Sequence, residues 1–135
     1  ALIMVLRTLS SVRPSHEEIK LVSKFKSEED LDFACELFAK TAVNYDEYQQ
    51  QIERFTRNWD VERIAFMDNL IMATAVAELV GFESIPVKVT LDEYIEIAKF
   101  YSTNSSGTFI NGVLDKLVAA LQQEGRINKS GRGLI

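Results

Sequence analysis

The chain has 135 residues, 47% of them hydrophobic, which is enough for one compact domain with a sizeable core and too little for two ordinary globular domains. Its 20 acidic and 15 basic residues give a net charge of −5, which excludes a uniformly basic protein that wraps nucleic acid. The charge is uneven, because residues 27–97 hold 16 acids and 5 bases whereas both flanking segments are basic. This distribution permits a local basic patch beside an acidic protein-docking face.

Cysteine and histidine are too scarce for a disulfide framework or a metal-bound fold. Cys35 is the one cysteine and His16 the one histidine, so neither an internal disulfide nor a structural zinc site can form. No apolar run reaches the roughly 18 residues that a membrane span needs. We therefore expect a soluble cytoplasmic protein without a membrane segment, a metal site or a cofactor.

Apolar residues recur at intervals of three and four along most of the chain, which is the helical period. A first helix is predicted from Leu2 to a stop at Pro14, and a capping box at Ser15 indicates a short second helix. Ser27 is predicted to cap the third helix. Asn44 is predicted to cap the fourth.

The second half of the chain continues the helical pattern. The longest helix is predicted to begin after Asp60 and to end at Gly81, where glycine can take a left-handed conformation. Either Pro86 or Thr90 opens the next helix, since proline suits a first helical position and the threonine has a glutamate three residues later. A last helix follows a polar loop and ends at Gly125. The prediction is an all-α bundle of six or seven helices.

Groups that could catalyse a reaction are few, and each has a simpler structural explanation. His16 follows a proline turn beside two glutamates, which is typical of a solvated helix start rather than of a general base. Cys35 lies in an apolar helical stretch, as a small core or boundary residue does. Asp92, Glu93 and Glu96 have no histidine or metal partner near them in the sequence and fit a solvated helix face. We expect no enzyme.

The run Phe109–Lys116 contains an unusual pair inside a strong helical pattern. Gly112 costs a helix about 1 kcal/mol relative to alanine. It indicates close approach of another helix backbone, while the preceding Asn111 indicates a side chain that bridges to a neighbouring loop. A packing role and a binding role are both open on this pattern alone.

This run and two segments before it resemble the NusB family of bacterial transcription antitermination factors. The family has an aliphatic-proline step, an acidic helix of the form INEAVELAK and then FVNGVLDK. The corresponding segments here are Ile85–Val89, Leu91–Lys99 and Phe109–Lys116. The resemblance extends over Ser27–Leu121.

The resemblance implies a fold of two three-helix bundles, in agreement with the helical periodicity. It also implies an RNA-binding adaptor in ribosomal RNA transcription antitermination. Such an adaptor binds boxA-type RNA together with a NusE-type small-subunit ribosomal protein, within a transcription elongation complex.

The resemblance divides the chain into three parts. Residues 1–26 form an N-terminal helical segment that matches the family poorly, because the arginine-rich first helix of the family is represented only by Arg7. Residues 27–125 form the NusB-like helical domain, and residues 126–135 form a flexible basic tail. Since the chain begins with Ala1, we expect the C-terminal, NusB-like portion of a longer chain.

The resemblance and the local chemistry also predict two sets of binding residues. Partner binding is assigned to Glu62 and Asp68 on an acidic surface of the long helix. The predicted RNA-binding residues lie around the last helix or in the tail: Ser105, Ser106, Thr108, Phe109, Asn111, Lys116, Arg126, Lys129 and Arg132. Backbone amides at the start of this helix can meet phosphate, and Phe109 either stacks on a base or belongs to the core. The tail is expected to add attraction without specificity.

Two other functions remain open on the sequence. Certain rRNA cytosine methyltransferases carry a NusB-like RNA-binding domain ahead of a catalytic domain, and this chain would then be that domain. Alternatively, it is a protein-interaction module that has lost RNA binding, which would fit the acidic middle segment and the weak N-terminal match.

Overall fold

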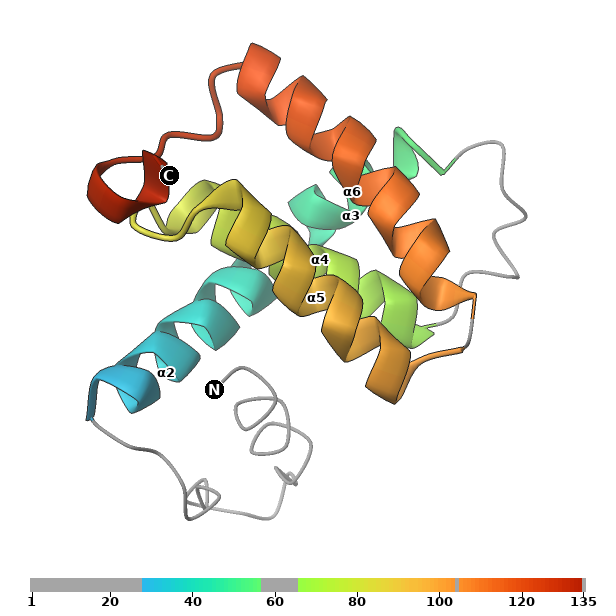
Figure 1. Cartoon of the computed structure of the whole chain (residues 1–135), viewed down its shortest axis with the longest axis horizontal. Coiled ribbons are helices and arrows are strands. Elements are labelled where there is room, and N and C mark those ends of the chain that lie inside the picture. The colour runs from blue at the N-terminus through green and yellow to red at the C-terminus, as the bar shows by residue number, and fades with distance from the viewer. Residues whose placement is uncertain (1–27, 57–65, 104, 135) are drawn as a thin grey trace.

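A computed structural model describes residues 28–56, 66–103 and 105–134 (Figure 1). Five α-helices and a short 3-10 helix make up this part, and it contains no strand. They are α2 (Glu28–Val43), α3 (Tyr45–Glu53), α4 (Phe66–Gly81), α5 (Val87–Tyr101), α6 (Ser106–Gln123) and η2 (Gly131–Leu134). The all-α prediction is confirmed. The helices predicted before Ser27 and the cap predicted at Asp60 lie outside the described residues.

Helix α4 is the centre of the fold. Its residues 71–79 are all buried, because the sequence is apolar on every side of the helix. It packs against α2, α3, α5 and α6, and α5 crosses in front of it in Figure 1. The neighbouring helices cover most of this stretch, and Ile71 and Thr74 line an apolar pocket that α4 shares with α2 and α5.

The core forms where these helices meet. Its larger members come from all five α-helices: Leu37, Tyr48, Ile52, Met72, Val76, Tyr94, Ile97, Ile110, Leu114, Leu117 and Leu121. Each fully buried side chain of this size contributes about 1.5–3 kcal/mol relative to exposure. The side chains of α6 enter at a spacing of three and four, so the opposite face of α6 remains exposed.

The structure corrects two predictions about helix ends. Gly81 ends α4, but positive φ angles in the described residues occur at Gly125 (72°) and Gly131 (55°) and not at Gly81. The carbonyl of Gly81 instead accepts a hydrogen bond of 2.8 Å from the Lys40 ammonium of α2. Asn44 precedes α3 without a side-chain cap, and its amide donates to the Lys40 carbonyl.

The starts and stops around α5 and α6 are better predicted. Pro86 precedes the first residue of α5, whereas Thr90 lies inside the helix and is fully buried. The last helix ends at Gly125 as predicted, and this glycine has a left-handed conformation. The next amide, that of Arg126, donates to the Leu121 carbonyl at 2.9 Å. No described helix is both long and apolar enough to cross a bilayer.

The prediction of a close helix contact at Gly112 is wrong. A Cβ atom built on Gly112 would meet no atom within 4 Å, and the residue lies on the exposed face of α6. Close packing therefore does not explain this glycine. No contact within the described fold compensates for the helix stability that Gly112 costs relative to alanine.

Candidate nucleic-acid interface

The exposed side of α6 carries several of the predicted RNA-binding residues. Ser105, Thr108 and Asn111 follow one another at a spacing of three, which places them along one ridge of the helix. All three are exposed, as is Lys116, which lies five residues beyond Asn111 and off this ridge. The ridge offers hydroxyl and amide groups, and Lys116 is the cation of the same helix.

The burial of Phe109 is intermediate between the core position and the base-stacking position that the sequence left open. Phe109 is half-buried and packs against the hydrophobic core while part of it reaches the surface. The ring therefore supports the start of α6, and the residue remains partly accessible.

Ser106 and Asp68 are placed differently from the prediction. Ser106 is 1% exposed and Asp68 is 5% exposed, so neither is available to a ligand at the surface. The Ser106 hydroxyl donates to the Asp68 carboxylate at 3.0 Å, and the Ser102 hydroxyl donates to its other oxygen. The resemblance assigned Asp68 to a surface that binds a partner, but the connection between α5 and α6 folds over it.

A second buried carboxylate lies near the other end of α4. Glu78 is 2% exposed and accepts hydrogen bonds from the Thr90 hydroxyl at 2.9 Å and the Tyr94 hydroxyl at 2.8 Å. Burial raises the pKa of Glu78, and these two hydrogen bonds oppose part of that rise. Burial, together with the Glu78 charge, also raises the pKa of Tyr94.

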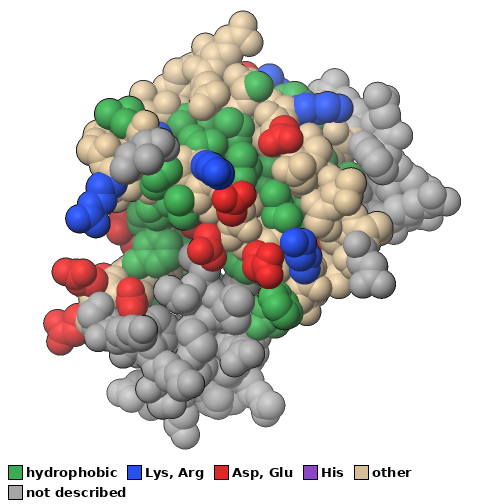
Figure 2. All heavy atoms as spheres, in the orientation of Figure 1, with side chains coloured by type: hydrophobic (Ala, Val, Ile, Leu, Met, Phe, Trp, Pro, Cys, Tyr) green, Lys and Arg blue, Asp and Glu red, His purple; other side chains and the backbone are tan. Residues whose placement is uncertain are grey.

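Because Asp68 and Glu78 are both buried, the described part of α4 has no exposed acid. The predicted acidic docking surface therefore does not lie on residues 66–81, and Glu62 is outside the described residues. On the face shown in Figure 2, acidic side chains gather over α5 and at the start of α2. The exposed acids of these two helices are Glu28, Glu29, Asp32, Glu36, Asp92, Glu93 and Glu96.

The C-terminal segment after α6 makes specific contacts, unlike the flexible tail that was predicted. Arg126 pairs with Glu47 of α3, and the Lys129 ammonium donates to the Phe82 carbonyl at 2.8 Å. Burial lowers the pKa of Lys129. A Cβ at Gly133 would lie 1.9 Å from the Glu83 carbonyl oxygen, so only glycine fits there. Composition signalled a mobile segment, but its glycine permits this close packing.

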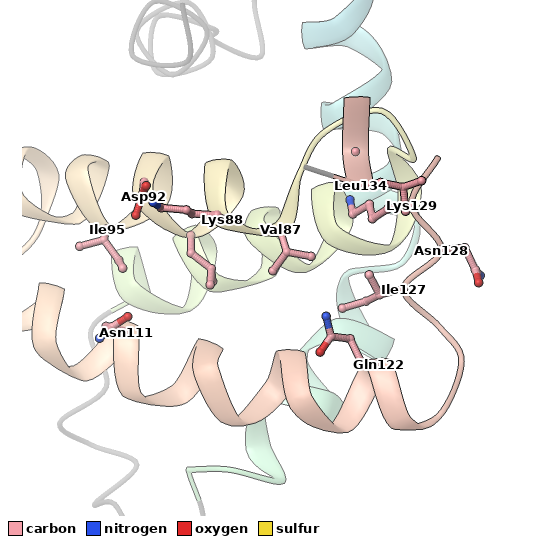
Figure 3. Close-up of a pocket in the computed structure, with 12 residues that line it drawn as sticks. Val87, Lys88, Asp92, Ile95, Asn111, Gln122, Ile127, Asn128, Lys129 and Leu134 are labelled. Carbon is pink, nitrogen blue, oxygen red and sulfur yellow. The ribbon is translucent and has the colours of Figure 1, made fainter. Parts of the chain in front are cut away.

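A groove of about 790 Å³ runs between α5 and α6 and is closed at one end by the C-terminal segment (Figure 3). Asn111 lies at one end of it and Lys129 toward the other. Lys88 and Asp92 of α5 also line it, and sequence reasoning assigned no binding role to Lys88. Arg132, in η2, is exposed. The structure thus brings two predicted RNA-binding residues to one groove and leaves the others along α6 or in the C-terminal segment.

The described residues contain no cluster of three or more histidine, cysteine or acidic side chains arranged to hold a metal ion. Cys35 is exposed on α2. Together, fold and surface define an all-helical domain whose main polar features are the α6 ridge and the acids of α2 and α5.

Comparison with known proteins places this domain in a family. A sequence profile described as the NusB family matches residues 3–119, and the chain belongs to that family. The transcription antitermination protein NusB of Salinibacter ruber is 49% identical over 104 residues, which cover 77% of this chain and 65% of that protein. Its counterpart in Chloroherpeton thalassium is 32% identical over 139 residues, covering 98% and 66%.

A solved structure agrees with the sequence comparison. NusB of T. maritima aligns with a TM-score of 0.66 and 31% sequence identity, covering 73% of this chain and 69% of that one. The chain spans about two thirds of the length of the two relatives from Salinibacter and Chloroherpeton.

Proposed function

We propose that this protein acts in transcription antitermination as an RNA-binding adaptor, without catalytic activity of its own. It binds boxA-type RNA together with a NusE-type small-subunit ribosomal protein, within a transcription elongation complex in the cytoplasm. Membership of the NusB family supports this role. The observation that carries it is the exposed ridge of Ser105, Thr108 and Asn111 at the start of α6.

The chemistry of the ridge suits RNA. Backbone amides in the first turn of a helix have no intrahelical acceptor and attract phosphate. Helix α6 begins at Ser106, so the positive end of its dipole lies at the same place and also attracts phosphate. The Asn111 amide can both donate to and accept from a base edge, and Phe109, which is partly exposed, can contact a base. Lys116 and Arg132 are exposed cations that can meet the phosphate backbone.

RNA binding tests the proposal directly. A labelled boxA-type RNA is titrated with the 135-residue protein at low salt, with and without the NusE-type partner, and affinity is read by fluorescence anisotropy. Asn111→Ala is expected to weaken binding about tenfold, because one well-placed amide–base pair is worth about 1–3 kcal/mol. Gln123→Ala is the matched control, since Gln123 is an exposed amide at the far end of the same helix. Absence of affinity with and without the partner would refute RNA binding by this chain.

One observation favours a second candidate, a protein-interaction module without RNA binding. Arg126 and Lys129 are occupied by Glu47 and by the Phe82 carbonyl, so two of the predicted phosphate-binding cations are already engaged. Partner binding that persists while RNA binding is absent would establish this second function. Family membership favours the adaptor.

A further inference from the structure

Two buried carboxylates on α4 hold the helices around it in place. Glu78 accepts from Thr90 and Tyr94, both on α5. Asp68 accepts from Ser102 and Ser106, which flank the connection between α5 and α6. In both cases a buried carboxylate accepts hydrogen bonds from two hydroxyl groups, but only Asp68 accepts one from the start of α6.

The Asp68 cluster extends through that connection. The Ser106 hydroxyl lies 2.9 Å from the Ser102 hydroxyl and 2.7 Å from the Thr103 hydroxyl, and it accepts from the Thr103 amide at 3.2 Å. One carboxylate thereby fixes both ends of the turn that leads into α6. The partners are 34 and 38 residues away in the sequence, so the contact sets tertiary rather than local geometry.

The start of α6 has no side-chain cap of the usual kind to hold it. Ser105 is the capping residue, and its side chain makes no capping hydrogen bond. The hydrogen bond between Ser106 and Asp68 is therefore a polar contact that ties the first turn of α6 to α4, beside the packing of Phe109 on the core.

We propose that Asp68 is a positioning residue for RNA, fixing the first turn of α6 through Ser102 and Ser106 so that the ridge of Ser105, Thr108 and Asn111 meets the RNA in one geometry. This inference rests on the proposed function. Asp68 does not contact the RNA, because it is 5% exposed and its two oxygens face the serine hydroxyls.

Charge and geometry predict opposite effects when Asp68 is changed. A carboxylate close to a phosphate site repels RNA, so if its charge dominated, removing it would strengthen binding at low salt. If its hydrogen bonds dominate, removing them weakens binding. Asp68→Asn removes the charge and keeps a side chain of the same shape that can bond to both serines, whereas Asp68→Ala removes both.

The test measures affinity for a boxA-type RNA in variants of the 135-residue protein, together with thermal unfolding and the amide NMR spectrum. Asp68→Ala is expected to weaken RNA binding on the order of tenfold, which corresponds to the loss of one net hydrogen bond to a charged group. Asp68→Asn is expected to leave affinity close to that of the wild type, because the amide can still form hydrogen bonds to both serines. Ser106→Ala, a milder change, is expected to weaken binding in the same direction and to add little to Asp68→Ala, because both break one link.

Glu78→Gln is the matched control, since it alters the other buried carboxylate of the same helix away from α6. It is expected to leave RNA affinity and the amide signals of residues 105–111 unchanged, while Asp68→Ala shifts those signals. Unchanged RNA affinity in folded Asp68→Ala and Ser106→Ala overturns the inference and leaves the proposed function standing. An equal loss in Glu78→Gln also overturns it, because the effect is then one of general stability. Failure of the wild type to bind RNA refutes the proposed function instead.

Discussion

At the scale of single residues, Glu78 and Asp68 show how an apolar helix accommodates acids. A buried carboxylate without partners would be strongly unfavourable, and two hydroxyl donors reduce that cost without supplying an opposite charge. Asp68 is satisfied by serines from a turn, and Glu78 by Thr90 and Tyr94 from a helix. Both acids are therefore structural groups, and the raised pKa of Glu78 links its protonation to stability.

Glu78 is expected to make the protein more stable as the pH falls from neutral. Its pKa is raised in the folded protein, so the folded state binds the proton more tightly than the unfolded state, whose glutamates titrate near 4.5. Ionised Glu78 therefore costs stability above its folded pKa, and this cost is relieved as the pH falls toward 4.5. Glu78→Gln should remove this contribution and flatten the curve of unfolding free energy against pH over that window.

Denaturant unfolding of the wild type and of Glu78→Gln at a series of pH values measures the effect. The difference between the two curves isolates Glu78 from the other carboxylates, which both proteins share. Parallel curves would show that Glu78 titrates alike in the folded and unfolded protein.

Sequence reasoning could not find these residue contacts. Asp68 and Ser106 were both selected as binding residues, one for a protein and one for RNA, yet they bind each other. Their pairing depends on how the turn between α5 and α6 folds back over α4, and no local pattern contains that information. A signal for Glu78 was present, because a lone acid in the apolar stretch 71–79 can be buried only with hydrogen-bond donors.

At the scale of helices, periodicity was sufficient to predict where the helices lie but not what they expose. The buried face of α6 follows from the spacing of Ile110, Leu114 and Leu117, whereas α5 buries Ile97 and leaves Ile95 partly exposed. The neighbours of α4 could not be predicted from spacing, because a helix that is apolar on all sides has no single buried face to indicate where they pack. The same limit applies to Gly112, whose open surroundings only the structure reveals.

Gly112→Ala is expected to stabilise the protein by about 0.5–1 kcal/mol, because alanine lowers the backbone entropy cost of the helix and meets no neighbour. Thermal or denaturant unfolding measures this gain. RNA affinity of the same variant then separates two explanations for the glycine. If affinity falls while stability rises, Gly112 permits close approach of the RNA beside Asn111. A loss of stability would instead reveal a contact that the open space around Gly112 does not predict.

At the scale of the whole molecule, the uneven charge seen in the sequence becomes two separate features. Positive residues of the C-terminal segment are used partly for internal contacts, which join α3 and the turn between α4 and α5 to the end of α6. Exposed acids gather on α2 and α5 instead of on α4. The sequence predicted that an acidic face exists, and only the packing of the helices could decide which element carries it.

The acids of α5 are expected to guide a basic partner. Ribosomal proteins are generally basic, and complementary charge accelerates association more than it adds to affinity. Changing Asp92 and Glu93 to lysine should slow association with the NusE-type protein by about tenfold at low salt, because such charges act on the rate of encounter. Stopped-flow or surface-binding kinetics at two salt concentrations measures this effect. Changing Asp46 and Glu53, two exposed acids on α3, to lysine is the control for the same change of charge elsewhere. An equal effect of this control would mean that net charge, rather than the face of α5, directs the partner, and an unchanged rate at low salt would place the docking surface elsewhere.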